Sequence, residues 1–238
     1  IHLPLVSLSD ILHNSVAICE QVNQLCRPLE HFTHYMQQGY YPFGAEGFAT
    51  YNQRLENTVD LLLNIELPQL RKVDIGNIRK LKALLSVLAS EVPMLVDTAK
   101  LSTLLGISRN TLLAYLEYLD EAKLIKRLYS DDLSVKKMQK PDKILMDNCN
   151  LLKVLALKEP NIGTLRETFF CNQLGYQHQV EYSKQGDFLI DHHITFEIGG
   201  QAKEGKQVAA VENAYIVSDE IEYSYGNKLP IWLFGLLY

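Results

Sequence analysis

The chain has 238 residues, of which 47% are hydrophobic and 21% are charged, and its formal net charge is −5. This composition is that of an ordinary globular protein with one or two domains. No apolar run approaches the roughly 18 residues that a membrane helix needs, and no basic n-region opens the chain. The sequence therefore predicts neither a membrane partner nor a secretory signal.

The spacing of cysteine and histidine bears on compartment and metal binding. The four cysteines are Cys19, Cys26, Cys149 and Cys171, and they form no Cys-x-x-Cys pair. A disulfide or metal framework needs closer grouping, so this spacing favours a reducing, cytoplasmic compartment. His31 with His34, and His192 with His193, lack a neighbouring cysteine or a His-Glu-x-x-His pattern, and we expect no zinc site there. Because the chain begins without methionine, we also expect a fragment of a longer protein.

The apolar pattern predicts an α+β protein made of three segments, residues 1–75, 76–157 and 158–238. The first is expected to be helical, because Ser9–Leu25 and Gln53–Ile65 carry apolar residues at spacings of three and four. The glycines and proline of Gln38–Gly44 interrupt any helix between them. This segment is too small and irregular to form a complete domain with its own core.

The second segment is predicted to be a winged-helix domain. After a first amphipathic helix, Asp97 or Thr98 caps a short second helix, Ala99–Leu105, which Gly106 ends, and Ser108 caps a third. Two short amphipathic helices joined this tightly are typical of a helix-turn-helix.

Two strands are expected after these helices, at Leu124–Leu128 and Lys143–Met146, with a polar turn between them. Charge is concentrated around this hairpin. Between Lys123 and Lys143 there are seven cations and three acids, so this stretch carries +4 and the rest of the chain −9. A local basic stripe on an acidic protein indicates contact with nucleic acid, although it also fits a solvated strand edge.

The third segment is predicted to be α/β. A helix is expected at Leu165–Leu174, and short strands rich in β-branched and aromatic residues follow it. The expected strands are Gln179–Tyr182, Phe188–Ile190, Ile194–Ile198, Ala214–Val217 and Ile231–Phe234.

Five stretches together resemble a known family. They are Phe32–Phe43 (FTHYMQQGYYPF), Leu104–Thr111 (LLGISRNT), Gly163–Phe170 (GTLRETFF), Gly186–Phe188 (GDF) and Phe196–Gly200 (FEIGG). In this order they resemble the prokaryotic AAA-type ATPase-like proteins with a C-terminal domain of unknown function. The resemblance covers nearly the whole chain.

This resemblance implies an origin for each segment. Residues 1–75 would be left from the ATPase lid, 76–157 would be the winged helix, and 158–238 would be a degenerate domain of the restriction-endonuclease-like fold. The ATP-binding core would lie upstream of Ile1, so the missing ATPase domain is an expected partner. ATP and Mg²⁺ would belong to that parent, and no cofactor is expected in this fragment.

A near-match to a phosphate-binding loop occurs at Gly200–Gln207 (GQAKEGKQ), but glutamine stands where the magnesium-binding Ser or Thr would be. Val208–Glu212 is a possible start of the helix that such a loop requires. Too few residues remain for the rest of a nucleotide-binding sheet, so we expect no nucleotide binding here.

The second segment supplies the candidate contacts to double-stranded DNA. The third helix presents polar side chains near its beginning, and the turn of the hairpin adds two lysines that suit phosphate contacts. The candidates are Ser108, Arg109, Asn110, Thr111, Tyr115, Lys136 and Lys137. Glu117, Asp120 and Glu121 on the same helix oppose this interpretation, since many winged helices serve only to dock proteins.

The third segment supplies candidate catalytic acids. Glu167, Asp187 and Glu197 follow the order of the restriction-endonuclease-like fold, and Asp187 and Glu197 are the candidate ligands of Mg²⁺ or Mn²⁺. The motif expects a lysine two residues after the glutamate, but Gly199 occupies that position, and Lys203 would have to reach in from the loop. We therefore expect a non-catalytic domain; the alternatives are an active metal-dependent nuclease and a purely structural or oligomerisation module.

Overall fold

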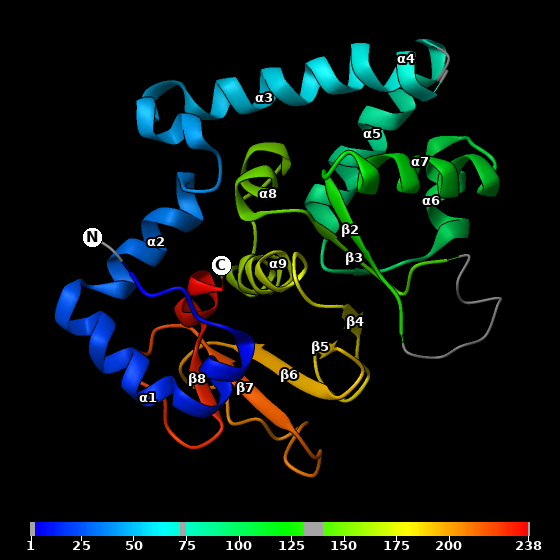
Figure 1. The fold of residues 1–238 in the computed structure, drawn as a ribbon. Coiled ribbons are helices and arrows are strands. Elements are labelled where there is room, and N and C mark those ends of the chain that lie inside the picture. Colours follow the sequence, from blue (N-terminus) through cyan, green and yellow to red (C-terminus); the bar gives the residue numbers. More distant parts are fainter. Residues whose placement is uncertain (1–2, 72–74, 131–139, 238) are drawn as a thin grey trace. The chain divides into compact units, whose positions relative to one another are not determined.

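The computed structural model describes residues 3–71, 75–130 and 140–237 (Figure 1). It is a mixed α+β structure with a helical N-terminal region and a sheet-containing C-terminal part. The chain forms two compact units, one of residues 37–161 and one of residues 1–36 together with 162–238. These limits differ from those of the three segments expected from the sequence. None of the helices in the described part of the chain combines the length and apolar character that a membrane crossing requires.

The unit of residues 37–161 is mainly helical and carries a small sheet of three antiparallel strands in the order β1-β3-β2. The helices and turns are η1 (Pro42–Glu46), η2 (Phe48–Thr50), α3 (Tyr51–Leu61), the π-helical turn η3 (Leu62–Glu66), α4 (Leu67–Arg71), α5 (Ile75–Glu91), α6 (Thr98–Leu105), α7 (Arg109–Glu121) and α8 (Cys149–Leu155). The strands are β1 (Met94–Leu95), β2 (Ile125–Leu128) and β3 (Lys143–Met146). The expected second and third helices and the hairpin strands lie where the sequence places them.

Local hydrogen bonds define the tight connection between α6 and α7. Asp97 Oδ1 accepts from the backbone N–H groups of Ala99 and Lys100, both at 3.0 Å, and this caps α6. Gly106 ends that helix in the left-handed region, with φ 58°, where glycine has no steric penalty. Ser108 then caps α7 by accepting from the backbone N–H of Thr111 at 3.1 Å. The chain therefore turns sharply between two short helices, as the sequence predicts.

The stretch Tyr40–Phe43, part of the first motif of the resemblance, has a structural role. Asn150 Oδ1 accepts from the Tyr51 hydroxyl at 2.5 Å and from the backbone N–H of Tyr40 at 2.9 Å. Asn148 Nδ2 donates to the Tyr41 hydroxyl at 3.0 Å, and the Tyr41 and Phe43 rings stack with centroids 5.5 Å apart. Burial raises the pKa of the Tyr51 hydroxyl. These bonds join η1, α3 and α8 into one core.

The other unit has a five-stranded sheet in the order β4-β5-β6-β7-β8 (Figure 1). Its first three strands are antiparallel, and β6, β7 and β8 run parallel. The elements are α1 (Leu8–Leu25), α2 (Pro28–Gln38, of which residues up to Met36 belong here), α9 (Ile162–Leu174), β4 (Val180–Tyr182), β5 (Phe188–Ile190), β6 (Ile194–Gly199), β7 (Ala214–Ser218), β8 (Lys228–Pro230) and the 3₁₀ helix η4 (Ile231–Leu236). The backbone N–H of Val6 donates to the carbonyl of Leu236 at 3.0 Å and so ties the two ends of this unit together.

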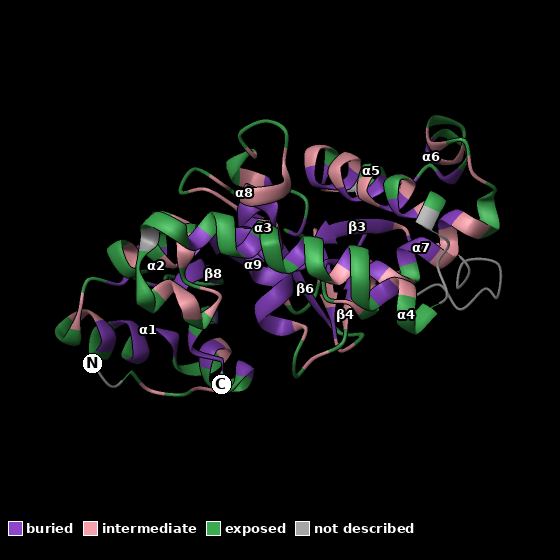
Figure 2. Cartoon of the chain, turned by 90° about the horizontal axis from the view of Figure 1, so that it is seen from above, coloured by how far each residue is buried: buried purple, intermediate pink, exposed green. Residues whose placement is uncertain are grey.

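The core of this unit is aromatic. Phe170 on α9 is fully buried, and its ring lies 5.4 Å from that of Phe188, 5.0 Å from that of Phe196 and 4.8 Å from that of Phe234. Figure 2 shows α9 buried along most of its length. A helix covered on nearly all sides has little hydrophobic asymmetry, so the helical period of its apolar residues is weak.

One expectation for this unit is wrong, and one alternative that the sequence left open is excluded. Ile231–Phe234 is the 3₁₀ helix η4 and not a strand; the last strand is β8, which ends at Pro230. A continuous apolar run does not distinguish a buried strand from a buried helix. Val208–Glu212 forms turns and begins no helix, so the strand–loop–helix arrangement of a phosphate-binding loop is missing after Gly200.

Candidate functional site

The first turn of α7 presents polar side chains to solvent. Ser108, Arg109 and Asn110 are exposed, and Thr111 is half-buried. The Ser108 and Thr111 hydroxyls lie 2.8 Å apart, so part of their bonding capacity is already used to cap the helix. The opposite face is buried, through Leu112, Leu116 and Leu119. Arg109 and Asn110 are therefore the side chains of this turn that are best placed to meet another molecule.

The acidic side chains near the end of α7 are paired with cations. Asp120 Oδ2 accepts from the Arg127 guanidinium at 2.9 Å, and Glu121 forms an ion pair with Arg71. These pairs offset two of the three acids that oppose an approach to phosphate. The negative charge of α7 therefore opposes DNA contact less in the folded chain than the sequence alone suggests.

The remaining DNA-binding candidates have different outcomes. Tyr115 is only 4% exposed and packs inside the unit, with its ring centroid 6.5 Å from that of Tyr118, so its expected place on the exposed side is wrong. The reason is helical geometry, because position 115 follows Leu112 by three residues and shares its buried face. Lys136 and Lys137 lie outside the described residues.

The candidate acids Asp187 and Glu197 lie next to each other, Asp187 immediately before β5 and Glu197 on β6. Phe188 on β5 pairs with Phe196 on β6, which places Asp187 beside Glu197 at the end of the ladder. The backbone N–H of Asp187 donates to the carbonyl of Phe196 at 2.8 Å, and Asp187 Oδ2 accepts from the backbone N–H of Ile198 at 2.6 Å. Glu197 is 1% exposed. The structure therefore brings together these two of the candidate acids.

Lys203 reaches this site from the loop after β6. Its Nζ lies 2.9 Å from Glu197 Oε1. The loop is held firmly, because Nζ of the buried Lys228 donates to the carbonyls of Gln201 at 2.6 Å and of Lys203 at 3.0 Å. The backbone N–H of Lys203 also donates to the carbonyl of Gly200 at 3.0 Å. Lys203 thus reaches in from the loop, and the bonds from Lys228 hold the loop backbone in place.

Glu167 does not complete a metal site with these acids. It lies half-buried on α9 and has interactions of its own. Across residues 3–71, 75–130 and 140–237, no three His, Cys, Asp or Glu side chains are grouped so that they could hold a metal ion. One oxygen of Asp187 is bonded to a backbone N–H, and one oxygen of Glu197 is paired with an ammonium group. Mg²⁺ prefers six oxygen ligands in octahedral geometry, and with Lys203 bound to Glu197 this donor set does not fit it.

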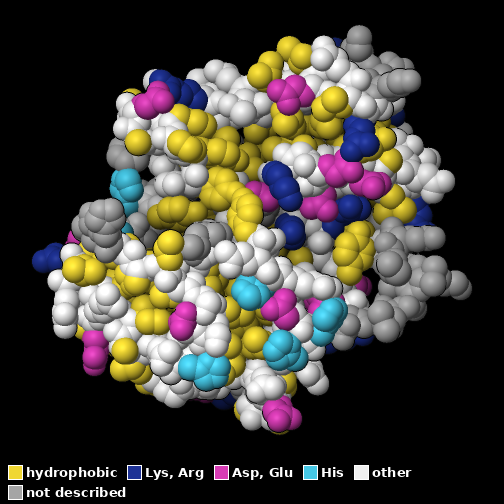
Figure 3. All heavy atoms as spheres, viewed as in Figure 1, with side chains coloured by type: hydrophobic (Ala, Val, Ile, Leu, Met, Phe, Trp, Pro, Cys, Tyr) yellow, Lys and Arg dark blue, Asp and Glu magenta, His cyan; other side chains and the backbone are white. Residues whose placement is uncertain are grey.

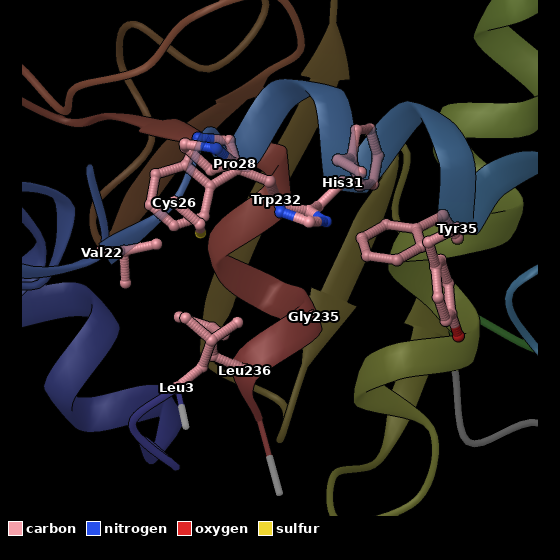
Figure 4. Close-up of a pocket in the computed structure, with 11 residues that line it drawn as sticks. Leu3, Val22, Cys26, Pro28, His31, Tyr35, Trp232, Gly235 and Leu236 are labelled. Carbon is pink, nitrogen blue, oxygen red and sulfur yellow. The ribbon is translucent and has the colours of Figure 1, made fainter. Parts of the chain in front are cut away.

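An apolar cavity of about 450 Å³ lies between α1, α2, α9 and η4 (Figure 4). Figure 4 shows Cys26, Pro28, Trp232 and His31 near one another, with Leu3 and Leu236 on the other side of the cavity. The Trp232 indole N–H already donates to the carbonyl of Ile221 at 3.2 Å, and Gln173 Nε2 donates to the Tyr35 hydroxyl at 3.3 Å. The cavity has the size of a small-molecule site.

A second cavity, of about 340 Å³, brings together histidines that are distant in the sequence. His13, His178 and His193 line it with Asp191, and Figure 3 shows histidine side chains gathered on this face. His178 Nδ1 lies 2.7 Å from Asp191 Oδ2, and Nδ1 of His13 and of His193 each lies within hydrogen-bond distance of a backbone carbonyl. Burial tends to raise the pKa of Asp191, but the bonds from His178 and from the Gln179 N–H hold it below its usual value. Of the three histidines of this cavity, only His193 was considered from the sequence, as the neighbour of His192, and neither His13 nor His178 was connected with it.

The comparisons with known proteins place the unit of residues 37–161 in a family. Residues 29–161, more than half of the chain, match the family described as Domain of unknown function (DUF8612). The chain belongs to this family. The DUF8612 stretch includes all of α7 and ends where the other unit resumes, so it excludes the acid pair on β5 and β6. No curated protein and no solved structure matches the chain.

Proposed function

We propose that this DUF8612 protein is the C-terminal binding and regulatory portion of a cytoplasmic AAA-type ATPase-like protein. In this proposal α5, α6, α7 and the β2–β3 hairpin act as a winged helix that contacts double-stranded DNA weakly. Three helices followed by an antiparallel hairpin, with a glycine-ended turn between the second and third, support it.

The observation that carries the proposal is the exposed first turn of α7. Helix-turn-helix proteins read base edges with residues at the beginning of their second helix, and helix N-termini favour phosphate. Arg109 and Asn110 occupy this position, and arginine and asparagine are side chains that form bidentate contacts with guanine and adenine. The Arg71–Glu121 and Arg127–Asp120 pairs reduce the repulsion that the rest of the helix would exert.

ATP turnover belongs, in this proposal, to the presumed parent and not to this chain. The loop Gly200–Gln207 is followed by turns, and Lys206 pairs with Glu204 at 2.7 Å on the surface. A phosphate-binding loop instead directs its backbone N–H groups and its lysine at the phosphates from the beginning of a helix. We expect calorimetry to detect no ATP binding; saturable binding that Lys206→Ala abolishes would contradict this.

Fluorescence anisotropy with a labelled DNA duplex tests the DNA contact, with salt varied from low concentration upwards. We expect weak, salt-dependent binding by the full chain. Arg109→Ala should weaken it; a fall of about 0.9 in the slope of log affinity against log salt would indicate that Arg109 contacts a phosphate, and an unchanged slope would indicate a base contact. Arg27→Ala is the matched control, because the Arg27 side chain is 82% exposed and lies in the other unit. Equal binding by the Arg109→Ala variant and the wild type would exclude this surface.

A metal-dependent nuclease is the second candidate function. The observation that favours it is the Lys203–Glu197 pair beside Asp187, since a lysine at such a position can stabilise negative charge on a phosphodiester. The poor fit of the donor set to Mg²⁺ counts against it. Supercoiled plasmid incubated with the protein and Mn²⁺ decides between the two: nicking that is lost in Asp187→Ala would establish the nuclease, and intact plasmid is what we expect.

A further inference from the structure

We propose that the Lys203 ammonium is an internal cation that fills the place of a divalent metal ion beside Glu197 and Asp187. The chain then carries a latent site for Mn²⁺ or Mg²⁺, which opens when this lysine is removed. The inference concerns the sheet of the unit formed by residues 1–36 and 162–238, and it stands whether or not α7 contacts DNA.

The first step is the charge of Glu197. A carboxylate that is 1% exposed needs a compensating charge, because transfer of an unpaired ion from water into a protein interior is strongly unfavourable. Lys203 Nζ, 2.9 Å from Oε1, supplies that charge. Within the described residues, Oε2 is buried and has no hydrogen-bond partner. One oxygen of this buried carboxylate is therefore paired by the lysine, and the other keeps unused ligand capacity.

The second step is the neighbour of Glu197. Asp187, the residue before β5, lies beside it and receives a backbone hydrogen bond from Ile198 at Oδ2. Two neighbouring carboxylates attract a divalent cation, since together they provide hard oxygen ligands and two negative charges. The ammonium group of Lys203 provides one positive charge and takes one of these oxygens. The site is thus partly neutralised before any metal ion arrives.

The third step is that Gly199 leaves room for the Lys203 side chain. A Cβ atom at position 199 would lie 2.7 to 2.8 Å from Cβ, Cγ and Cδ of Lys203, closer than carbon atoms approach in proteins. Only glycine at 199 leaves the path of the Lys203 side chain open. The loop is fixed on its other side by Lys228 and by the backbone N–H of Asp219, which donates to the carbonyl of Gly199 at 2.9 Å. The glycine that replaces the expected lysine therefore makes room for a lysine from the loop.

Mn²⁺ binding by the full chain and by Lys203→Met tests the proposal. Methionine keeps the length and apolar stem of the side chain but removes its charge. We expect the wild type to show no Mn²⁺-dependent rise in melting temperature and no binding isotherm by calorimetry. Lys203→Met should bind Mn²⁺ at least roughly tenfold more tightly and melt at a higher temperature when Mn²⁺ is added.

Three further variants make the result specific. Lys206→Met removes an exposed lysine, 86% exposed, from the same loop and should leave Mn²⁺ binding as in the wild type. Lys203→Met combined with Glu197→Gln should lose the acquired binding. Lys203→Gln serves as a second uncharged variant if Lys203→Met does not fold.

Three outcomes would overturn the proposal. In the first, the wild type binds Mn²⁺ as tightly as Lys203→Met, which would mean that the lysine does not block the site. In the second, a variant with an uncharged residue at 203 folds, as judged by circular dichroism and a cooperative urea transition, and still binds no Mn²⁺. Plasmid nicking by the wild type with Mn²⁺, lost in Lys203→Met, would assign the lysine a catalytic role instead.

Discussion

In the unit formed by residues 1–36 and 162–238, charged side chains near the acid pair point inward, whereas in the unit of residues 37–161 the charged side chain at the beginning of α7 points to solvent. Glu197, Lys228 and Arg166 are all buried, and Arg109 is exposed. Each of these buried groups has a charged or polar partner within the fold, and burial keeps it away from a partner molecule in solution. The exposed group remains available to a partner.

The two 13-residue helices of these units show the same difference. Arg166 on α9 is buried, and its guanidinium bonds Asp219 Oδ2 at 2.9 Å and Glu220 Oε1 at 3.3 Å. On α7, by contrast, one stripe is buried and the first turn is open to solvent. Charge on α9 therefore contributes to the internal order of its unit, and charge on α7 is the better candidate for recognition.

The largest expected effect is that of Lys228→Met. Lys228 is 6% exposed, and its removal leaves the carbonyls of Gln201 and Lys203 without their charged donor. We expect the free energy of unfolding to fall by about 3 kcal/mol, measured by urea denaturation. Lys206→Met, on the exposed side of the loop, should change it little. If Lys228→Met and Lys206→Met had the same free energy of unfolding, the buried lysine would contribute no more to stability than the exposed one.

Gly199→Ala should have the next largest effect, because its new methyl group would collide with the Lys203 side chain. We expect a loss of about 2 kcal/mol in the free energy of unfolding, as for other overpacked positions. Gly235→Ala is the control, since a Cβ there would lie 3.6 Å from Phe169 Cζ, an ordinary contact. If Gly199→Ala left the free energy of unfolding unchanged, the Lys203 side chain could reach Glu197 without passing close to position 199.

The sequence predicts elements well where a periodic apolar pattern coincides with a cap or a breaker. The α6–α7 turn is the best case, because Asp97, Gly106 and Ser108 each act through bonds to residues close by. The run Ile231–Phe234 is the opposite case, since four consecutive buried apolar residues carry no period and the preceding proline does not determine which element follows.

The candidate site was only partly predictable for a related reason. The pairing of Asp187 with Glu197 follows from strand alternation and short-range order. The position of Lys203 depends instead on Lys228, which lies 25 residues further along the chain, and no local pattern signals such a contact. The burial of Tyr115 was predictable from helical spacing, because it lies three residues after Leu112. Tyr115 was instead grouped with the exposed polar residues because it carries a hydroxyl.

Ser108→Ala addresses the exposed side of the comparison and should have a moderate effect. The serine hydroxyl accepts from the Thr111 N–H, and loss of an N-cap lowers stability by about 1 kcal/mol. Thr103→Ala is the control, because its hydroxyl bonds only the carbonyl of Ala99 within α6, among the contacts described. Urea denaturation with a helix-sensitive circular dichroism signal measures both. A loss in the control as large as that in Ser108→Ala would contradict the capping role.

The smallest expected effect concerns an exception to the comparison. The carboxyl group of Asp147 is buried, although it lies in the unit of residues 37–161. Burial raises the pKa of Asp147, while the hydrogen bond from Asn148 Nδ2 and the charges of Lys123 and Lys126 partly lower it. A raised pKa means that the folded chain favours the protonated acid, so the stabilising contribution is present below the ordinary aspartate pKa and is lost as pH rises through the raised one.

Asp147→Asn tests this sign, because asparagine keeps the shape of the protonated acid and does not titrate. The other acids titrate equally in the variant and in the wild type, so their contribution cancels in the difference between the two unfolding free energies. We expect this difference to favour Asp147→Asn increasingly as pH rises above the unfolded value of 3.8, and to level off once Asp147 is ionised in the folded chain. Urea denaturation at several pH values between about 3 and 7 measures it. A difference that moved in the opposite direction would mean that Lys123 and Lys126 stabilise the ionised carboxylate more than burial disfavours it, and the exception would disappear.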